Sequence, residues 1–220
     1  MDFIPSDESP LFIKGFRIYT YYLFKRRFSK VWLKQEYQPD NSSKTIYYLN
    51  HHSWWDGLIP FLLNEYIFHQ RARAVMGIQQ MQKYSFFKKI GAFSINRNDQ
   101  RQTLRSLRYA VESFERPNAS LFIYPQGEIT PPGSSLHFEK GLAWLSQQLT
   151  DIEIVPIGIY IHTVRNDKPE LHLWIGPSIK TETSHSKQEL TQKFENKLEN
   201  ILEKLRETAG FDDSIFERFI

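Results

Sequence analysis

The sequence contains no cysteine among its 220 residues. This excludes disulfide bonds, cysteine-ligated zinc and iron–sulfur sites, and cysteine nucleophiles, and it makes a reducing compartment the simplest setting. The sequence also lacks an apolar run of the roughly 18–20 residues that a membrane-spanning helix needs. Lys and Arg interrupt the apolar residues near the N-terminus, so we expect neither a transmembrane helix nor a signal peptide.

Aromatic residues are abundant, with 17 Phe, 11 Tyr and 5 Trp. The hydrophobic content of 40% and the charged content of 24% are those of a folded globular chain, which excludes wholesale disorder. The net charge is +3. A basic, aromatic-rich chain favours an anionic partner, either a nucleic acid or a membrane surface.

The basic residues are concentrated near the N-terminus. Residues 11–35 contain seven Lys and Arg and no acid, with eight aromatic residues among them. The spacings Phe12–Phe16–Tyr19–Leu23 and Phe24–Phe28–Val31–Trp32 are typical of a helix. Such a helix fits a membrane interface, and the alternative is a helix that packs on the domain with its bases in solvent. No nucleic-acid-binding motif follows, so we expect no nucleic acid partner.

Downstream, strand-like and helix-like segments alternate, which predicts a single α/β domain with a mixed, largely parallel sheet flanked by helices. Residues 1–40 are expected to form an N-terminal helical segment at the membrane interface, and residues 41–220 the domain. The expected strands are 45–49, 72–77, 92–95, 120–124, 153–161 and 171–175, and the expected helices are 57–68, 79–89, 99–116, 138–149 and a last one that starts with a capping box at Ser186 and Glu189.

The segment that follows the expected strand 45–49 carries the first candidate catalytic group. His51 is followed five residues later by Asp56, across a turn. A carboxylate on one imidazole nitrogen would fix the tautomer and leave the other nitrogen as a general base. His52, four residues before Asp56, is a competing candidate that spacing alone does not exclude. Two adjacent histidines without a third ligand make a poor metal site, so no metal is expected here.

Three further segments lie at expected strand ends, where open α/β sheets place their sites. In the first, a Gly turn at Gly91 and a short apolar strand with Phe93 lead to Arg97. The Arg97 guanidinium at the sheet edge is suited to bind phosphate or carboxylate. Residues 122–128 end a strand in a Pro/Gly turn that can expose N–H groups to an anion. Val155 and Pro156 lie in a buried strand and favour an architectural role.

Together and in this order, these four segments resemble the glycerolipid O-acyltransferase family, over roughly residues 45–177. The N-H-x4-D block is similar to Asn50, His51 and Asp56, and this resemblance favours His51 over His52 as the base. The second block is similar to Gly91, Phe93 and Arg97, and its Arg implies contact with the phosphate of the acceptor. Tyr124, Pro125 and Gly127 match the third block in part, Val155 and Pro156 match the fourth, and Phe138, Lys140 and Gly141 resemble the stretch that follows the third block.

The third block departs from the family pattern at Gln126, Glu128 and Ile129, where the family has Glu and then Thr-Arg. An added carboxylate and a missing Arg would disfavour a dianionic phosphate by about 1 kcal/mol or more, unless Arg97 or Lys140 compensates. The resemblance therefore implies Arg97, Gln126, Gly127, Glu128 and Lys140 as acceptor-binding residues. A lysophospholipid or glycerol-phosphate-like acceptor is expected, and a glycosylated lipid or pigment is the alternative.

The resemblance implies acyl transfer from acyl-CoA or acyl-acyl carrier protein, with His51 as general base, Asp56 as its partner and no cofactor. Backbone N–H groups near Gly127 would stabilise the oxyanion, and residues 81–87 with Trp54 and Trp55 would line an apolar acyl slot. The protein is expected to be peripheral or monotopic at the cytoplasmic face of a membrane. A lipid-binding relative without turnover is the remaining alternative.

Overall fold

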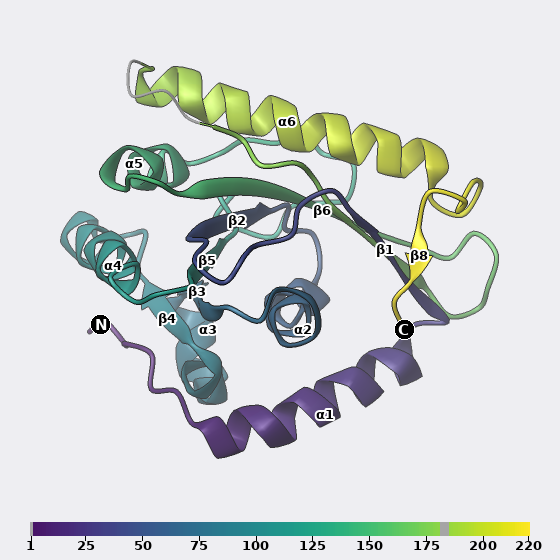
Figure 1. Ribbon diagram of the computed structural model, residues 1–220, viewed down its shortest axis with the longest axis horizontal. Coiled ribbons are helices and arrows are strands. Elements are labelled where there is room, and N and C mark those ends of the chain that lie inside the picture. Colours follow the sequence, from purple (N-terminus) through teal and green to yellow (C-terminus); the bar gives the residue numbers. More distant parts are fainter. Residues whose placement is uncertain (1, 181–184) are drawn as a thin grey trace.

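The computed structural model describes residues 2–180 and 185–220. One eight-stranded sheet with the order β4-β3-β5-β2-β6-β7-β1-β8 forms its centre (Figure 1). The strands are β1 (Lys30–Gln35), β2 (Thr45–Leu49), β3 (Arg71–Gly77), β4 (Ala92–Ile95), β5 (Ala119–Ile123), β6 (Glu153–His162), β7 (Glu170–Ile175) and β8 (Glu217–Arg218). The β6–β7 and β1–β8 pairs are antiparallel and all the other pairs are parallel.

Helices cover both faces of the sheet (Figure 1). They are α1 (Pro10–Arg27), η1 (Trp54–Gly57), α2 (Ile59–Leu63), η2 (Asn64–Phe68), α3 (Ile78–Lys83), η3 (Ser85–Ile90), α4 (Gln100–Ser113), α5 (Gly141–Gln148) and α6 (Lys187–Thr208). One apolar core lies between the sheet and α1, α2 and η3, and a second lies beneath α4, α5 and α6. The expectation of one α/β domain with a mixed, largely parallel sheet and an N-terminal helix is confirmed.

The N-terminal segment is helical only in part. The spacing predicted helix as far as Trp32, but α1 ends at Arg27 and residues 30–35 form β1. Val31 and Leu33 are buried while Lys30, Trp32 and Lys34 are half-buried, which is the alternation of a strand. The prediction of helix as far as Trp32 is therefore wrong beyond Arg27, because β1 joins the sheet between β7 and β8.

Helix α1 has an inner face and an outer face of different character. Phe24 is fully buried, and Phe16 packs on Phe61 and Phe86. The outer face exposes a stripe of Leu11, Ile18 and Tyr22, which are 60–83% exposed, and bases adjoin this stripe: Lys14, Lys25 and Arg26. Among the described helices, none combines the length and the apolar character that crossing a membrane requires.

Several local predictions are confirmed by the contacts. Asp99 caps α4 through its side chain, and Ser186 and Glu189 form the capping box of α6. Strands β2 and β4 have the predicted bounds. The helix expected from residue 138 begins only at Gly141, since residues 126–139 remain a loop. This loop returns over the carboxyl end of β2, where Thr130 donates its N–H to the carbonyl of His51 (3.0 Å).

Candidate active site

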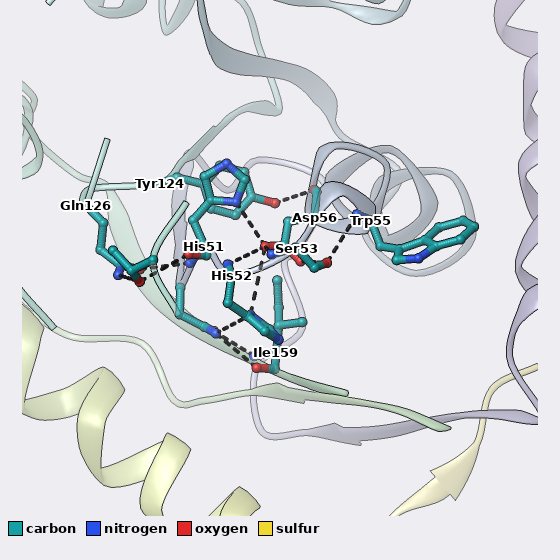
Figure 2. A network of polar contacts seen from close by, with 10 residues as sticks. His51, His52, Ser53, Trp55, Asp56, Tyr124, Gln126 and Ile159 are labelled. Atoms are coloured by element: carbon teal, nitrogen blue, oxygen red, sulfur yellow. Dashed lines mark hydrogen bonds and ion pairs between the residues drawn. The ribbon is translucent and has the colours of Figure 1, made fainter. Parts of the chain in front are cut away.

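His51 and Asp56 lie together just beyond the carboxyl end of β2. His51 Nδ1 and Asp56 Oδ2 are 2.9 Å apart, as the five-residue spacing predicted (Figure 2). The turn that joins them is stabilised by Ser53, whose hydroxyl accepts from the Trp55 N–H (3.1 Å) and caps the short helix η1. This cap brings Asp56 back over the strand end, so that its carboxylate reaches the imidazole ring.

The Asp56 carboxylate is fully buried and surrounded by donors. It accepts hydrogen bonds from the backbone N–H groups of His52 (2.7 Å) and Ser53 (2.8 Å), from the Ser53 hydroxyl (2.8 Å) and from His51. Because His51 Nδ1 donates to this fixed acceptor, its Nε2 carries the lone pair. The His51 side chain is 21% exposed, so a substrate can reach this nitrogen.

The structure distinguishes His51 from His52, the competing candidate for the general base. The His52 side chain is largely buried, and its Nδ1 lies 3.1 Å from the Asn50 amide nitrogen, which can donate to it. Burial lowers the pKa of His52, against the opposing effect of Asp56. The nearest approach of its ring nitrogen to Asp56 is 3.9 Å, so the short carboxylate contact belongs to His51.

Gln126 is a buried residue that holds His51 in place. Its Oε1 accepts from the His51 N–H (2.8 Å), and its Nε2 donates to the Thr130 hydroxyl (2.7 Å). The amide thus ties the strand β2 end to the 126–139 loop (Figure 2). Both of its polar groups are engaged within the protein, which describes a positioning residue, and its predicted contact with the acceptor stays a prediction.

Gly127 and Arg97 meet at the edge of this site, so the second and third sequence blocks are in contact. Gly127 has φ +72°, and a Cβ there would lie 2.1 Å from Arg97 Nη1. Arg97 Nη1 also donates to the Gln126 carbonyl (3.4 Å). The glycine is thus needed twice, for its left-handed backbone and for the close approach of the guanidinium.

Glu128 and Lys140, the two remaining acceptor candidates, lie farther out. Glu128 is mostly exposed, and its carboxylate is 3.8 Å from Arg97 Nη2. Lys140 is exposed at the start of α5, and among the described residues it has no ion pair or side-chain hydrogen bond with the other site residues. The structure therefore brings Arg97, Gln126, Gly127 and Glu128 together but leaves Lys140 at the surface.

Two residues of the site have structural roles that the sequence did not predict. The Asn50 side chain pairs with both backbone groups of Ile159, at 2.9 and 2.8 Å, and so joins the end of β2 to β6. Tyr124 packs its ring on His51, with 4.5 Å between the ring centroids, and donates its hydroxyl to the Asp56 carbonyl. Both belong to the matched blocks, and their position beside the His and the turn was the signal for these roles.

Tyr124 also lines a cavity of about 440 Å³, whose wall does not include His51. Its wall is mainly apolar in the middle, with Phe61, Met76, Phe87 and Phe122. Toward the amino end of β3 it becomes charged, where Glu8 pairs with Arg73 and lies 3.9 Å from Arg116. Phe87 is the one residue of the predicted slot set that lines this cavity, since Trp54 is exposed and Trp55 packs on Phe24 and Phe28.

The family model "Acyltransferase" matches residues 30–160, more than half of the chain. The crystal structure of the 1-acyl-sn-glycerophosphate (LPA) acyltransferase PlsC from Thermotoga maritima is similar, with a TM-score of 0.63 and 18% identity. The alignment covers 88% of this chain and 79% of that one. No curated protein matches the sequence significantly. At this level of identity, the structural similarity shows a shared fold.

Proposed function

Because the chain belongs to the acyltransferase family, as its sequence blocks indicated, we propose that it moves a fatty acyl group from an acyl thioester to a lipid hydroxyl. The donor is acyl-CoA or acyl-acyl carrier protein, and the acceptor is a lysophospholipid or a glycerol-phosphate-like molecule. The observation that carries this proposal is the 2.9 Å contact between His51 and the buried Asp56. Tyr124, which packs on the His51 ring, also lines the large apolar cavity.

In this proposal, His51 Nε2 accepts the proton of the acceptor hydroxyl while the oxygen attacks the thioester carbonyl. Asp56 stabilises the resulting imidazolium through the Nδ1 hydrogen bond. The tetrahedral intermediate then expels the thiolate, which recovers the proton from His51. Base and acid are thus the same ring, and no covalent acyl-enzyme is required.

The oxyanion would need a donor close to the Gly127 turn. The N–H of Gly127 itself donates to the Tyr124 carbonyl (2.9 Å), so another group near Gly127 would have to serve. The Arg97 guanidinium, which lies against Gly127 and donates to the Gln126 carbonyl, is a donor beside this turn. We infer that Arg97 serves either the oxyanion or an anionic group of the acceptor, since a guanidinium suits both.

The acyl chain would occupy the cavity behind Tyr124. Residues 71–76 of β3 line this cavity. At about 3.3 Å per residue, this stretch of strand is roughly 17 Å long, which suits an extended hydrocarbon chain. Ile13 of α1 contributes to the same wall. Helix α1 thus joins the cavity to its own exposed apolar stripe.

The outer face of α1 supports the same assignment. The α1 stripe of Leu11, Ile18 and Tyr22 beside Lys14, Lys25 and Arg26 presents apolar side chains and cations together. This combination binds anionic lipid, with apolar groups in the interface and bases on the phosphates. We propose that the protein is peripheral, at the cytoplasmic face, with α1 against the membrane.

One contact favours a neutral acceptor as the second candidate. Glu128 lies 3.8 Å from Arg97 and competes for its positive charge, although both groups are exposed and the pair is weak. A hydroxylated lipid without phosphate, such as a glycosylated lipid or pigment, would not require an unpaired Arg97. The variant Glu128→Ala should therefore raise activity toward lysophosphatidate if the acceptor is a phosphate lipid.

The decisive experiment measures thiol release from palmitoyl-CoA and from palmitoyl-acyl carrier protein, with lysophosphatidate or a neutral glycolipid as acceptor. His51→Ala should lower the rate by about 10²–10⁴-fold, since it removes the general base. His137→Ala, an exposed histidine of the neighbouring loop, is the matched control. Release that is independent of His51, or absent with every donor and acceptor, would favour a lipid-binding relative without turnover.

A further inference from the structure

A second cluster of chemically active side chains lies where β6 and β7 form their hairpin, near the C-terminal end of α6. His162 is directly opposite Glu170 in the antiparallel register, and His172 lies two residues farther along β7 on the same face. One potential ligand atom from each of the three residues lies within 4.8 Å of the others. The hairpin turn lies beside the chain that leaves α6, at the right of Figure 1.

The cluster is buried, and two of its nitrogens lack partners. His172 is fully buried, Glu170 is 1% exposed and His162 is 8% exposed. His172 Nδ1 and His162 Nε2 have no hydrogen-bond partner among the described residues, although the two rings are only 5.0 Å apart. A buried polar atom without a partner costs about 1–3 kcal/mol, so two in one place call for a ligand.

The surrounding contacts orient the ring of His172 for coordination. Its Nε2 donates to Asp213 (3.0 Å), which is in turn held by Arg165 (2.7 Å). A carboxylate on one nitrogen leaves the lone pair on the other, which is the arrangement of metal-binding histidines. Glu170 is fixed by the Trp32 indole N–H (2.7 Å).

We propose that His162 Nε2, Glu170 and His172 Nδ1 bind one zinc ion. Two imidazoles and one carboxylate, with a water as the fourth ligand, are an established zinc coordination set, with protein–zinc bonds of about 2.0–2.2 Å. To bind at these lengths, the ligand atoms must approach one another from their present spread of up to 4.8 Å. Coordination through His162 Nε2 places its proton on Nδ1, which gives up the long hydrogen bond from the Val164 N–H (3.2 Å).

The position of the cluster indicates a structural ion. Gly210, just after α6, lies against the His162 ring, where a Cβ would be 2.7 Å from Cε1. The Gly210 N–H also donates to Asp213 (3.2 Å), the partner of His172. An ion here would fasten the β6–β7 hairpin to the segment after α6. The proposed ion does not involve the segment that contains His51.

The test uses the purified full chain after dialysis against EDTA. We expect one equivalent of added zinc to remain bound through gel filtration, by elemental analysis, and to raise the unfolding temperature. His162→Gln and His172→Gln should each lose the bound zinc and the thermal shift, while His137→Gln, the exposed control, retains both. Equal zinc content in all four proteins, or no thermal shift for the wild type, would overturn the proposal.

A second measurement covers the case in which the variants fail to fold. Cobalt(II) added to the wild-type chain should give the intense visible absorption of four-coordinate cobalt, and one equivalent of zinc should abolish it. Weak absorption of the six-coordinate type, or absorption that zinc does not displace, would refute the site without use of any variant.

Discussion

At the scale of single residues, the site depends on one carboxylate. The Asp56 carboxylate accepts hydrogen bonds from a ring nitrogen, two backbone N–H groups and a hydroxyl, and it is fully buried. Its position is set before substrate arrives, so the tautomer of His51 is set as well. Pre-orientation of this kind removes reorganisation from the reaction step.

The variant Asp56→Asn tests this role. An amide retains the size of the side chain but is a weaker acceptor and stabilises the imidazolium less, so kcat should fall by about 10²–10⁴-fold. The KM for the acyl donor should change much less. Steady-state kinetics with a circular dichroism spectrum would check this, and a loss of affinity without a loss of kcat would contradict it.

Gly127 allows a prediction with a matched control. Gly127→Ala forces a left-handed backbone on alanine and displaces the Arg97 guanidinium. Gly133→Ala imposes a similar backbone, at φ +85°, with no atom within 4 Å. The left-handed backbone should cost about 1–3 kcal/mol at both sites. Urea unfolding should show both losses, and only Gly127→Ala should also weaken acceptor binding, measured as KM.

At the scale of elements, α1 and β1 show how far the sequence could predict the fold. The strands and the capped helices were predictable, because period-two apolar patterns and side-chain caps are local. The strand nature of residues 30–35 was not, since Val31 and Trp32 also continue a helical spacing. Pairing with β7, far along the chain, decided the outcome.

The site was predictable to a similar degree. The His51–Asp56 contact followed from spacing, and the family resemblance assigned Arg97 and Gly127 to one acceptor site without predicting their contact. The engagement of both Gln126 polar groups depends on Thr130 in a loop without regular structure, and the His162–Glu170–His172 cluster depends on hairpin register. Neither can be read from a single sequence.

The outer face of α1 should determine vesicle binding. Ile18→Asp places a charge in the middle of the exposed stripe and should lower binding to anionic vesicles about ten-fold or more, since it removes buried apolar area and adds repulsion. Leu104→Asp, on the exposed side of α4, is the matched control and should bind as wild type. Co-sedimentation with vesicles would measure both, and equal losses would contradict a role for α1.

At the scale of the whole molecule, the stability should depend on pH through buried histidine. Burial lowers the pKa of His52 below its ordinary value of 6.5. The unfolded chain therefore takes up a proton at a higher pH than the folded one. The resulting stability is complete above the unfolded pKa and is lost as the pH falls toward the folded pKa.

We expect the free energy of unfolding to fall between about pH 7.5 and pH 5.5, where an ordinary histidine becomes protonated. The variant His52→Gln should show a shallower decline over the same range, while His137→Gln, exposed in a loop, should follow wild type. Urea titrations across this range would give the slopes, and an unchanged slope in His52→Gln would refute the contribution of this residue.

The position of β1 in the sheet also affects how the protein is made. Ser29 bonds to the Pro169 carbonyl, 140 residues later, and β1 pairs with β7 over its whole length. At a synthesis rate of about 5–20 residues per second, β1 leaves the ribosome roughly 7–28 s before its partner. During that time β1, which is aromatic and basic, has no partner strand. Pairing between strands so far apart in the sequence also makes folding slow. The nascent chain is thus most exposed to misfolding and to chaperones at the end of the sheet farthest from β4.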